Sequence, residues 1–158
     1  MKKYVADVLY VLSVVLANTM VGILGESAAY IIPLVLIAVT MTTRDILHQT
    51  RKRWYMFFLI GVGSVLSYLL CVDFLPIAIA SSSAFLASEI VDYIVFQNLK
   101  GSWATRAFIS SVISSPIDSA VFITIAFGFN PILILVQTTL KIIGALWTIW
   151  VYEKVKEG

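Results

Sequence analysis

Six long apolar runs follow one another along the chain, separated by short polar or turn-forming segments. Each run is close to the length of about 20 residues that an α-helix needs to cross the hydrocarbon core of a bilayer. The pattern therefore predicts an all-α integral membrane protein, folded as a single transmembrane domain over residues 1–158. The six expected helices span residues 4–24, 28–43, 54–71, 77–99, 107–127 and 132–152.

The interruptions between the runs predict where the helices bend and end. Pro33 lies inside the second run and predicts a kink. Arg44–Arg53 is polar and basic, contains the single histidine, His48, and predicts a loop after the second helix. Val72–Pro76 predicts a turn, and Glu153–Gly158 predicts a charged tail after the sixth helix.

Composition supports a membrane protein and argues against several other classes. Of the residues, 60% are hydrophobic and 13% are charged, and the mean hydropathy is +0.97. Soluble domains contain about 25% charged residues. We find no phosphate-binding glycine loop, no nucleophile–base arrangement and no metal-ligand cluster, so we expect neither an enzyme nor a cofactor, metal or nucleic-acid partner. The lone Cys71 excludes an intramolecular disulfide.

The basic residues predict the orientation of the helices. With six helices and an inside N-terminus, all but one of the 11 basic residues fall on one side. Such an excess is typical of cytoplasmic segments, so we expect both termini in the cytoplasm and the protein in the inner or plasma membrane. The residues on that side are Lys2, Lys3, Arg44, Arg51, Lys52, Arg53, Lys100, Arg106, Lys154 and Lys156.

Several polar side chains lie within the predicted helices, where they are costly and commonly functional. Glu89 and Asp92 lie three residues apart in the fourth helix, with Phe85, Ser88 and Phe96 close by on one helical face.

Asp118 and Lys141 lie at similar depth on adjacent helices, so we expect them to pair. The pair is either an ion-pair staple or part of a polar cavity, and Asn18 and Gln137 favour the cavity.

Structural alternatives remain for the other features. Asp92 either faces the bundle or extends to the inner interface. Phe85, Phe122 and Trp147 are interpreted first as bundle core and second as platforms for a ligand ring. The serines of the fourth and fifth helices are interpreted as small residues that permit close helix packing.

Three segments together resemble the VUT, or queuosine-precursor transporter, family. They are Thr42–His48 at the end of the second helix, Ala80–Phe96 in the fourth, and Ser114–Gly128 in the fifth. Asn18 and Lys141 are similar to an asparagine and a lysine of the family's first and sixth helices. The resemblance implies uptake of a 7-deazaguanine base, 7-cyano-7-deazaguanine or its 7-aminomethyl counterpart. The outline is also similar to the substrate-binding subunits of energy-coupling-factor vitamin importers.

A guanine-like edge offers two adjacent hydrogen-bond donors, and the two oxygens of a buried carboxylate can accept both hydrogen bonds as a bidentate pair. For this role Glu89 is the first candidate and Asp118 the second, whereas Arg44 and Asp45 are expected to hold the inner end of the second helix. The expected substrate-binding residues are Glu89, Asp118, Asn18, Gln137, Lys141, Phe85, Ser88, Asp92 and Phe122. A substrate-binding subunit that docks on an energy-coupling partner and a non-transport membrane scaffold remain alternatives, and a homodimer is left open.

Overall fold

A computed structural model describes residues 4–70 and 75–157 of the chain. Helices account for nearly all of these residues, and no strand occurs among them. In chain order the elements are α1 (Val5–Leu24), the 3₁₀ helix η1 (Gly25–Tyr30), the π-helix η2 (Pro33–Ile37), α2 (Ala38–Thr50), α3 (Arg53–Leu70), α4 (Leu75–Asn98), α5 (Trp103–Phe127) and α6 (Pro131–Glu157).

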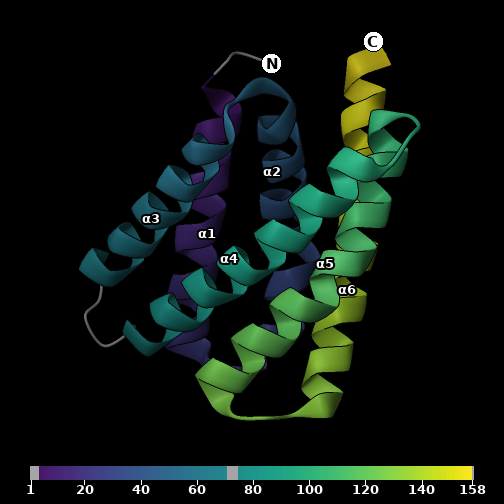
Figure 1. The fold of residues 1–158 in the computed structure, drawn as a ribbon. Helices are drawn as coiled ribbons and strands as arrows, with labels where there is room; N and C mark the ends of the chain where they lie inside the picture. Colours follow the sequence, from purple (N-terminus) through teal and green to yellow (C-terminus); the bar gives the residue numbers. More distant parts are fainter. Residues whose placement is uncertain (1–3, 71–74, 158) are drawn as a thin grey trace.

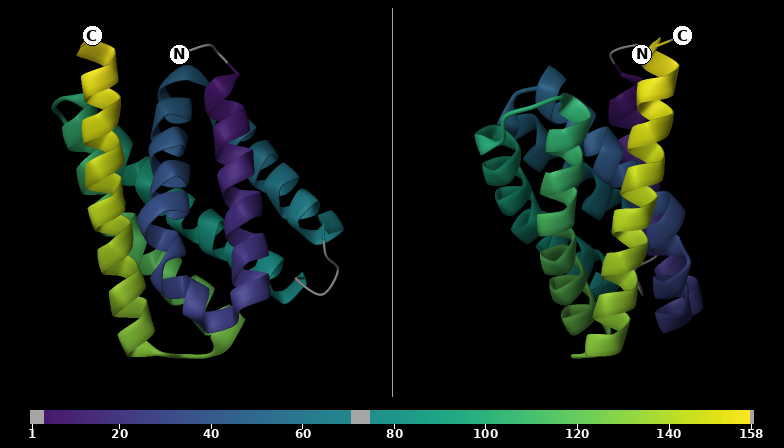
Figure 2. Two further views of the ribbon diagram at one scale, coloured as in Figure 1. Left: turned by 180° about the vertical axis from the view of Figure 1, so that it is seen from behind. Right: turned by 90° about the vertical axis from the view of Figure 1, so that its right-hand side faces the viewer.

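The helices pack as two layers (Figures 1 and 2). In one layer α2 lies between α1 and α6, and α4 and α5 cross the other side of the molecule. α3 packs on α1 and on α4 at one edge. The beginning of α1 and the end of α6 lie at the same end of the bundle, as an even number of crossings requires.

Four segments are long and apolar enough to cross a membrane: Val5–Ala28, Leu75–Asn98, Trp103–Phe127 and Pro131–Lys154. A shorter apolar helix spans Trp54–Leu69. The all-helical prediction is therefore confirmed for the described residues. The prediction of six spans is confirmed for four of them by length and composition.

The expected helix at residues 28–43 is wrong in its form. The chain there passes from η1 through η2 into α2, and η2 begins at Pro33, where the sequence predicted a kink. The expected loop Arg44–Arg53 is also wrong, because α2 continues to Thr50. Arg44 and Asp45 are buried in that helix and bind partners there, so their charges do not end it.

Three further boundaries differ from the expected ones. α5 begins at Trp103, because the Ser102 side chain accepts a hydrogen bond from Thr105 N at 3.2 Å and caps the first turn. α6 continues to Glu157, so the expected tail from Glu153 is helical. Cys71 and most of the expected turn that begins at Val72 lie outside the described residues.

The bundle has an apolar outside, and its interior combines apolar clusters with buried polar side chains. Apolar side chains such as Leu12, Ile94 and Leu135 are exposed on its surface, where lipid would cover them. Serines line the buried face of α5 and allow the close packing against neighbouring helices that the sequence predicted. Ser114 Oγ donates toward Asp92 Oδ1 of α4 at 3.5 Å. The fully buried serines of α5 are Ser110, Ser111, Ser114, Ser115 and Ser119.

Gly144 is a point of close approach between α6 and the second span. A Cβ there would lie 2.5 Å from the Ala38 Cβ and 2.6 Å from the Leu34 carbonyl oxygen. Backbone cannot move aside as a flexible side chain can, so we expect Gly144→Ala to lower stability by about 1–3 kcal/mol. Thermal melting in detergent measures the loss. Gly61→Ala is the control, since nothing lies within 4 Å of a Cβ at Gly61 and the melting temperature should stay unchanged.

Candidate functional site

Two small cavities lie inside the bundle. The larger, which we call the Lys141 cavity, has a volume of about 20 Å³, room for about one water molecule. Its walls come from α1, η2, α4, α5 and α6. The lining residues are Ala17, Asn18, Val21, Ile32, Ile37, Ser81, Ala84, Phe85, Asp118, Phe122, Gln137 and Lys141.

The second cavity, which we call the Arg44 cavity, has a volume of about 10 Å³. It is lined by Tyr10, Thr40, Met41, Arg44, Phe85, Ser88, Glu89 and Asp118. Phe85 and Asp118 line both cavities, so these two side chains lie between them.

The predicted pairing of Asp118 with Lys141 is confirmed. The Lys141 Nζ donates to Asp118 Oδ2, and both side chains are buried. Lys141 also donates to Gln137 Oε1 at 3.1 Å, and Ser88 Oγ donates toward Asp118 Oδ1 at 3.4 Å. The ion pair joins α5 to α6 and at the same time forms part of the wall of the Lys141 cavity.

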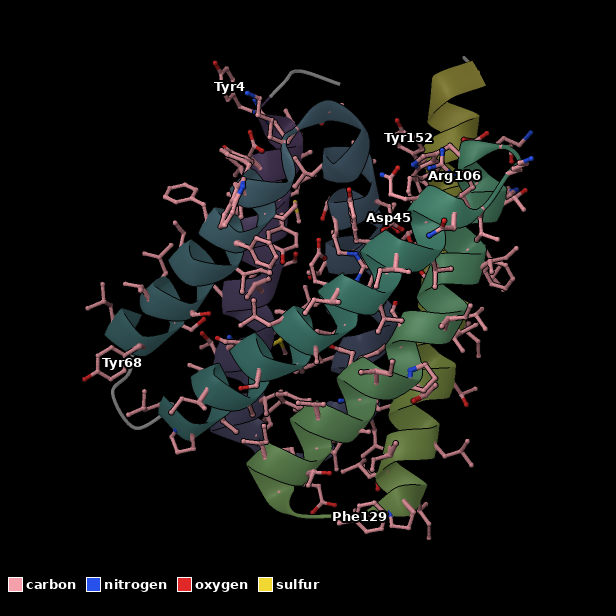
Figure 3. The ribbon with its side chains drawn as sticks, in the orientation of Figure 1. Tyr4, Asp45, Tyr68, Arg106, Phe129 and Tyr152 are labelled. Carbon is pink, nitrogen blue, oxygen red and sulfur yellow. The ribbon has the colours of Figure 1, made fainter. Side chains whose placement is uncertain are left out.

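Arg44 is the centre of a second buried cluster, which we call the Arg44 cluster and which comprises Arg44, Asp45, Glu89 and Asp92. The Arg44 Nη2 lies 2.6 Å from Asp92 Oδ1 and 3.2 Å from Asp45 Oδ1. The Arg44 Nε lies 3.8 Å from Glu89 Oε2. Asp45 lies in the interior of the bundle, whereas Tyr4, Tyr68 and Phe129 lie at its periphery (Figure 3). Asp92 thus faces the bundle, and the alternative in which it extends to the interface is wrong.

Sequence reasoning missed the Arg44 cluster, although the charge balance of the predicted spans pointed to it. The predicted spans held four acids, Asp7, Glu89, Asp92 and Asp118, but only one lysine. Buried charges are normally paired, so this imbalance required a second cation inside the bundle. Arg44 is that cation, and its burial removes it from the basic residues that were assigned to the cytoplasmic surface.

The structure brings most of the predicted site residues together. Asn18, Phe85, Asp118, Phe122, Gln137 and Lys141 line the Lys141 cavity. Ser88 and Glu89 line the Arg44 cavity, together with Phe85 and Asp118. Asp92 lines neither cavity and is held by Arg44 instead.

The placements of Asn18, Phe122 and Trp147 add to or correct the expected geometry. Asn18 donates to Ser67 Oγ at 3.0 Å, which ties α1 to α3 and leaves its carbonyl oxygen for other partners. Phe122 packs edge-on against Phe127, with ring centroids 6.1 Å apart. Trp147 is 55% exposed, so its expected place in the bundle core is wrong.

A bundle of apolar helices that encloses buried ion pairs and small polar cavities is typical of polytopic membrane proteins, in which intramembrane charges are paired and face the bundle interior. The sequence profile of a family described as "Putative vitamin uptake transporter" matches residues 5–155. The chain belongs to this family of membrane transporters, and it is a multi-pass membrane protein. No curated protein and no solved structure matches the chain significantly.

Proposed function

We propose that this protein imports a queuosine-precursor base, 7-cyano-7-deazaguanine or 7-aminomethyl-7-deazaguanine, and binds it in the Lys141 cavity. The observation that carries the proposal is the cavity itself. It brings together a carboxylate, an ammonium, two amides and two phenylalanine rings in the interior of a transporter-family bundle. The resemblance of Ala80–Phe96 to queuosine-precursor transporters supports the choice of base.

The chemistry of the lining residues suits a planar base with a guanine edge. A carboxylate accepts both donors of that edge, and the Asp118 carboxylate lines both cavities. Glu89 lies in the Arg44 cavity, one turn from Phe85, and remains the other candidate for the fork. Gln137 and Asn18 offer amides to a ring carbonyl, and Phe85 and Phe122 offer apolar faces for stacking.

The conformation is a closed one. A cavity that holds about one water molecule is too small for a purine-like base, so binding requires the walls to separate. Ile37 of η2 and Phe85 of α4 line the cavity from opposite layers. A π-helix is a rare form that is frequently found at functional sites, so η2 is the natural place for that adjustment.

The main alternative is a substrate-binding subunit that docks on an energy-coupling partner through small residues. Small residues in the second and fourth spans do not decide the question, because Ala28, Ser81 and Ala84 are buried inside the bundle whereas Ser82 and Ser83 are half-buried. Uptake by the purified chain alone separates this alternative from an independent transporter. A requirement for ATP and a second protein would favour the coupled form.

Proteoliposomes that contain only this protein should accumulate labelled 7-cyano-7-deazaguanine, with competition from other bases that carry the guanine edge. Asp118→Asn should weaken binding about 10- to 100-fold, because one acceptor of a charge-assisted fork becomes a donor. Glu89→Gln is measured in parallel and identifies which carboxylate faces the base. Glu26→Gln, on the exposed side of η1, is the matched control and should transport normally.

Two outcomes would contradict the proposal. Protein that is folded by its melting behaviour, yet binds no 7-deazapurine and accumulates none, contradicts the proposed substrate. Unchanged uptake in both Asp118→Asn and Glu89→Gln contradicts the proposed site.

A further inference from the structure

Two side chains form the wall between the Lys141 cavity and the Arg44 cavity. Phe85 of α4 and Asp118 of α5 line both cavities, whereas each of the other described lining residues belongs to one cavity alone. The cavities have volumes of about 20 Å³ and about 10 Å³, so each holds about one water molecule and neither admits a ring. The wall between them therefore decides whether the bundle can form a compartment for a base.

The two parts of this wall differ in how firmly they are held. Asp118 is buried, is bound by the Lys141 ammonium and accepts a hydrogen bond from Ser88 Oγ at 3.4 Å. Phe85 is half-buried and packs against the apolar cluster that contains Tyr10. A phenyl ring held by apolar contacts can change its rotamer, whereas a shift of Asp118 breaks a buried ion pair. Phe85 is therefore the part of the wall that can move.

We propose that the Arg44 cavity is the second compartment of the substrate site, and that Phe85 is the partition that the entering base displaces. The proposal rests on the proposed function, because it takes the base as the ligand. Rotation of the Phe85 ring joins the two cavities beside Asp118 into one continuous space. The volume that the ring vacates adds to the space gained where the walls separate at η2.

The joined site has hydrogen-bonding groups at both ends. Lys141 and Gln137 line the Lys141 cavity alone. Tyr10 and Glu89 line the Arg44 cavity alone, and Asp118 lies between the two ends. A ligand that fills the joined site is therefore a planar molecule with a polar group at each end. A 7-deazaguanine with a polar substituent at position 7 has this form, since the guanine edge and the substituent lie on different sides of the ring system.

Cysteine accessibility tests the partition without any ligand. The background is Cys71→Ser, which removes the only native cysteine. In that background Ser81→Cys reports the Lys141 cavity, and Ser88→Cys reports the Arg44 cavity. The measured quantity is the rate at which a small methanethiosulfonate reagent modifies Ser88→Cys, divided by the rate for Ser81→Cys. Phe85→Ala should raise this ratio by an order of magnitude, because the reagent can then pass from one cavity to the other.

Phe122→Ala is the matched control for this measurement. Phe122 lines the Lys141 cavity alone, so its removal should leave the ratio unchanged. Phe85→Leu keeps an apolar side chain in case Phe85→Ala does not fold, and it should raise the ratio by a smaller factor. A ratio that folded Phe85 variants leave unchanged overturns the proposal. A ratio that Phe122→Ala raises equally also overturns it.

Equilibrium binding of 7-cyano-7-deazaguanine tests the second compartment. Gln137→Leu in the Lys141 cavity and Tyr10→Phe in the Arg44 cavity should each weaken binding about 3- to 10-fold, which is the loss of one hydrogen bond. Tyr68→Phe, at the periphery of the bundle (Figure 3), is the control and should bind like the wild type. A loss of affinity in only one of the two cavity variants overturns the proposal, because the base then occupies one cavity alone. A wild type that binds no base contradicts the proposed function, whereas the labelling ratio tests the partition in either case.

Discussion

Replacing Lys141 with methionine is expected to remove about 3–5 kcal/mol of stability, since the change leaves the Asp118 carboxylate buried without its cation. Methionine keeps much of the length and volume of the lysine stem, so the loss reports the charge rather than a cavity. The melting temperature in detergent and the fraction of monodisperse protein measure the effect. Lys52→Met, at an exposed lysine, is the control and should melt like the wild type.

The double variant Asp118→Asn with Lys141→Met separates the two interpretations of this pair. Because neither charge remains in the interior, most of the lost stability should return. Uptake should not return, since the cavity has lost both its carboxylate and its ammonium. If the double variant recovers uptake along with stability, the pair is only a staple between α5 and α6 and the site lies elsewhere.

The helices that the sequence predicted best are those whose apolar length alone defines them. The apolar segments that contain α1, α4, α5 and α6 are each 24 or 25 residues long, longer than the roughly 20 residues that a bilayer crossing requires. Their boundaries differ from the predicted ones by a few residues, where local caps such as Ser102 decide the end. Hydrophobic length is a property of one segment, so the sequence reveals it without knowledge of any partner.

The second span could not be predicted in the same way, because its form depends on its neighbours. Arg44 and Asp45 appear as loop residues until Asp92 is known to lie beside them, and Asp92 is 48 positions away in the chain. Gly144 of α6 likewise admits the backbone at Leu34 within a distance that no other residue type would allow. Both features depend on the lateral order of the helices, which apolar length does not specify.

Candidate site residues were predictable as a set but not in their pairings. Depth along a helix placed Asp118 beside Lys141, because the two helices are adjacent and joined by a short turn. Depth alone could not assign Glu89 and Asp92 to an arginine on α2, nor Asn18 to Ser67 on α3. The exposure of Trp147 shows the same limit, since helical periodicity does not state which face meets lipid.

Arg44→Gln is expected to be the most destabilising of the charge replacements. Glutamine cannot neutralise any of the three carboxyl groups that now face one guanidinium, so the loss should exceed the roughly 3–5 kcal/mol of a single broken pair. Arg44→Lys should lose less, since it keeps the charge while giving up the two-nitrogen contact with Asp45. Melting temperatures of both variants, with Lys52→Gln as the control, give this order. Equal stability of Arg44→Gln and the wild type would contradict the importance of the cluster.

The stability of the Arg44→Gln variant is expected to depend on pH. Burial and the neighbouring Asp92 carboxylate raise the pKa of Asp45, and Arg44 lowers it, so in the variant the folded protein holds a proton on Asp45 at neutral pH that the unfolded chain does not. The free energy of unfolding of the variant therefore rises as pH falls, because the folded state binds more protons than the unfolded state. Melting of the variant should improve between pH 7 and pH 5 relative to the wild type. A difference between the two proteins that stays constant with pH would mean that Arg44 stabilises the bundle by packing and not by charge.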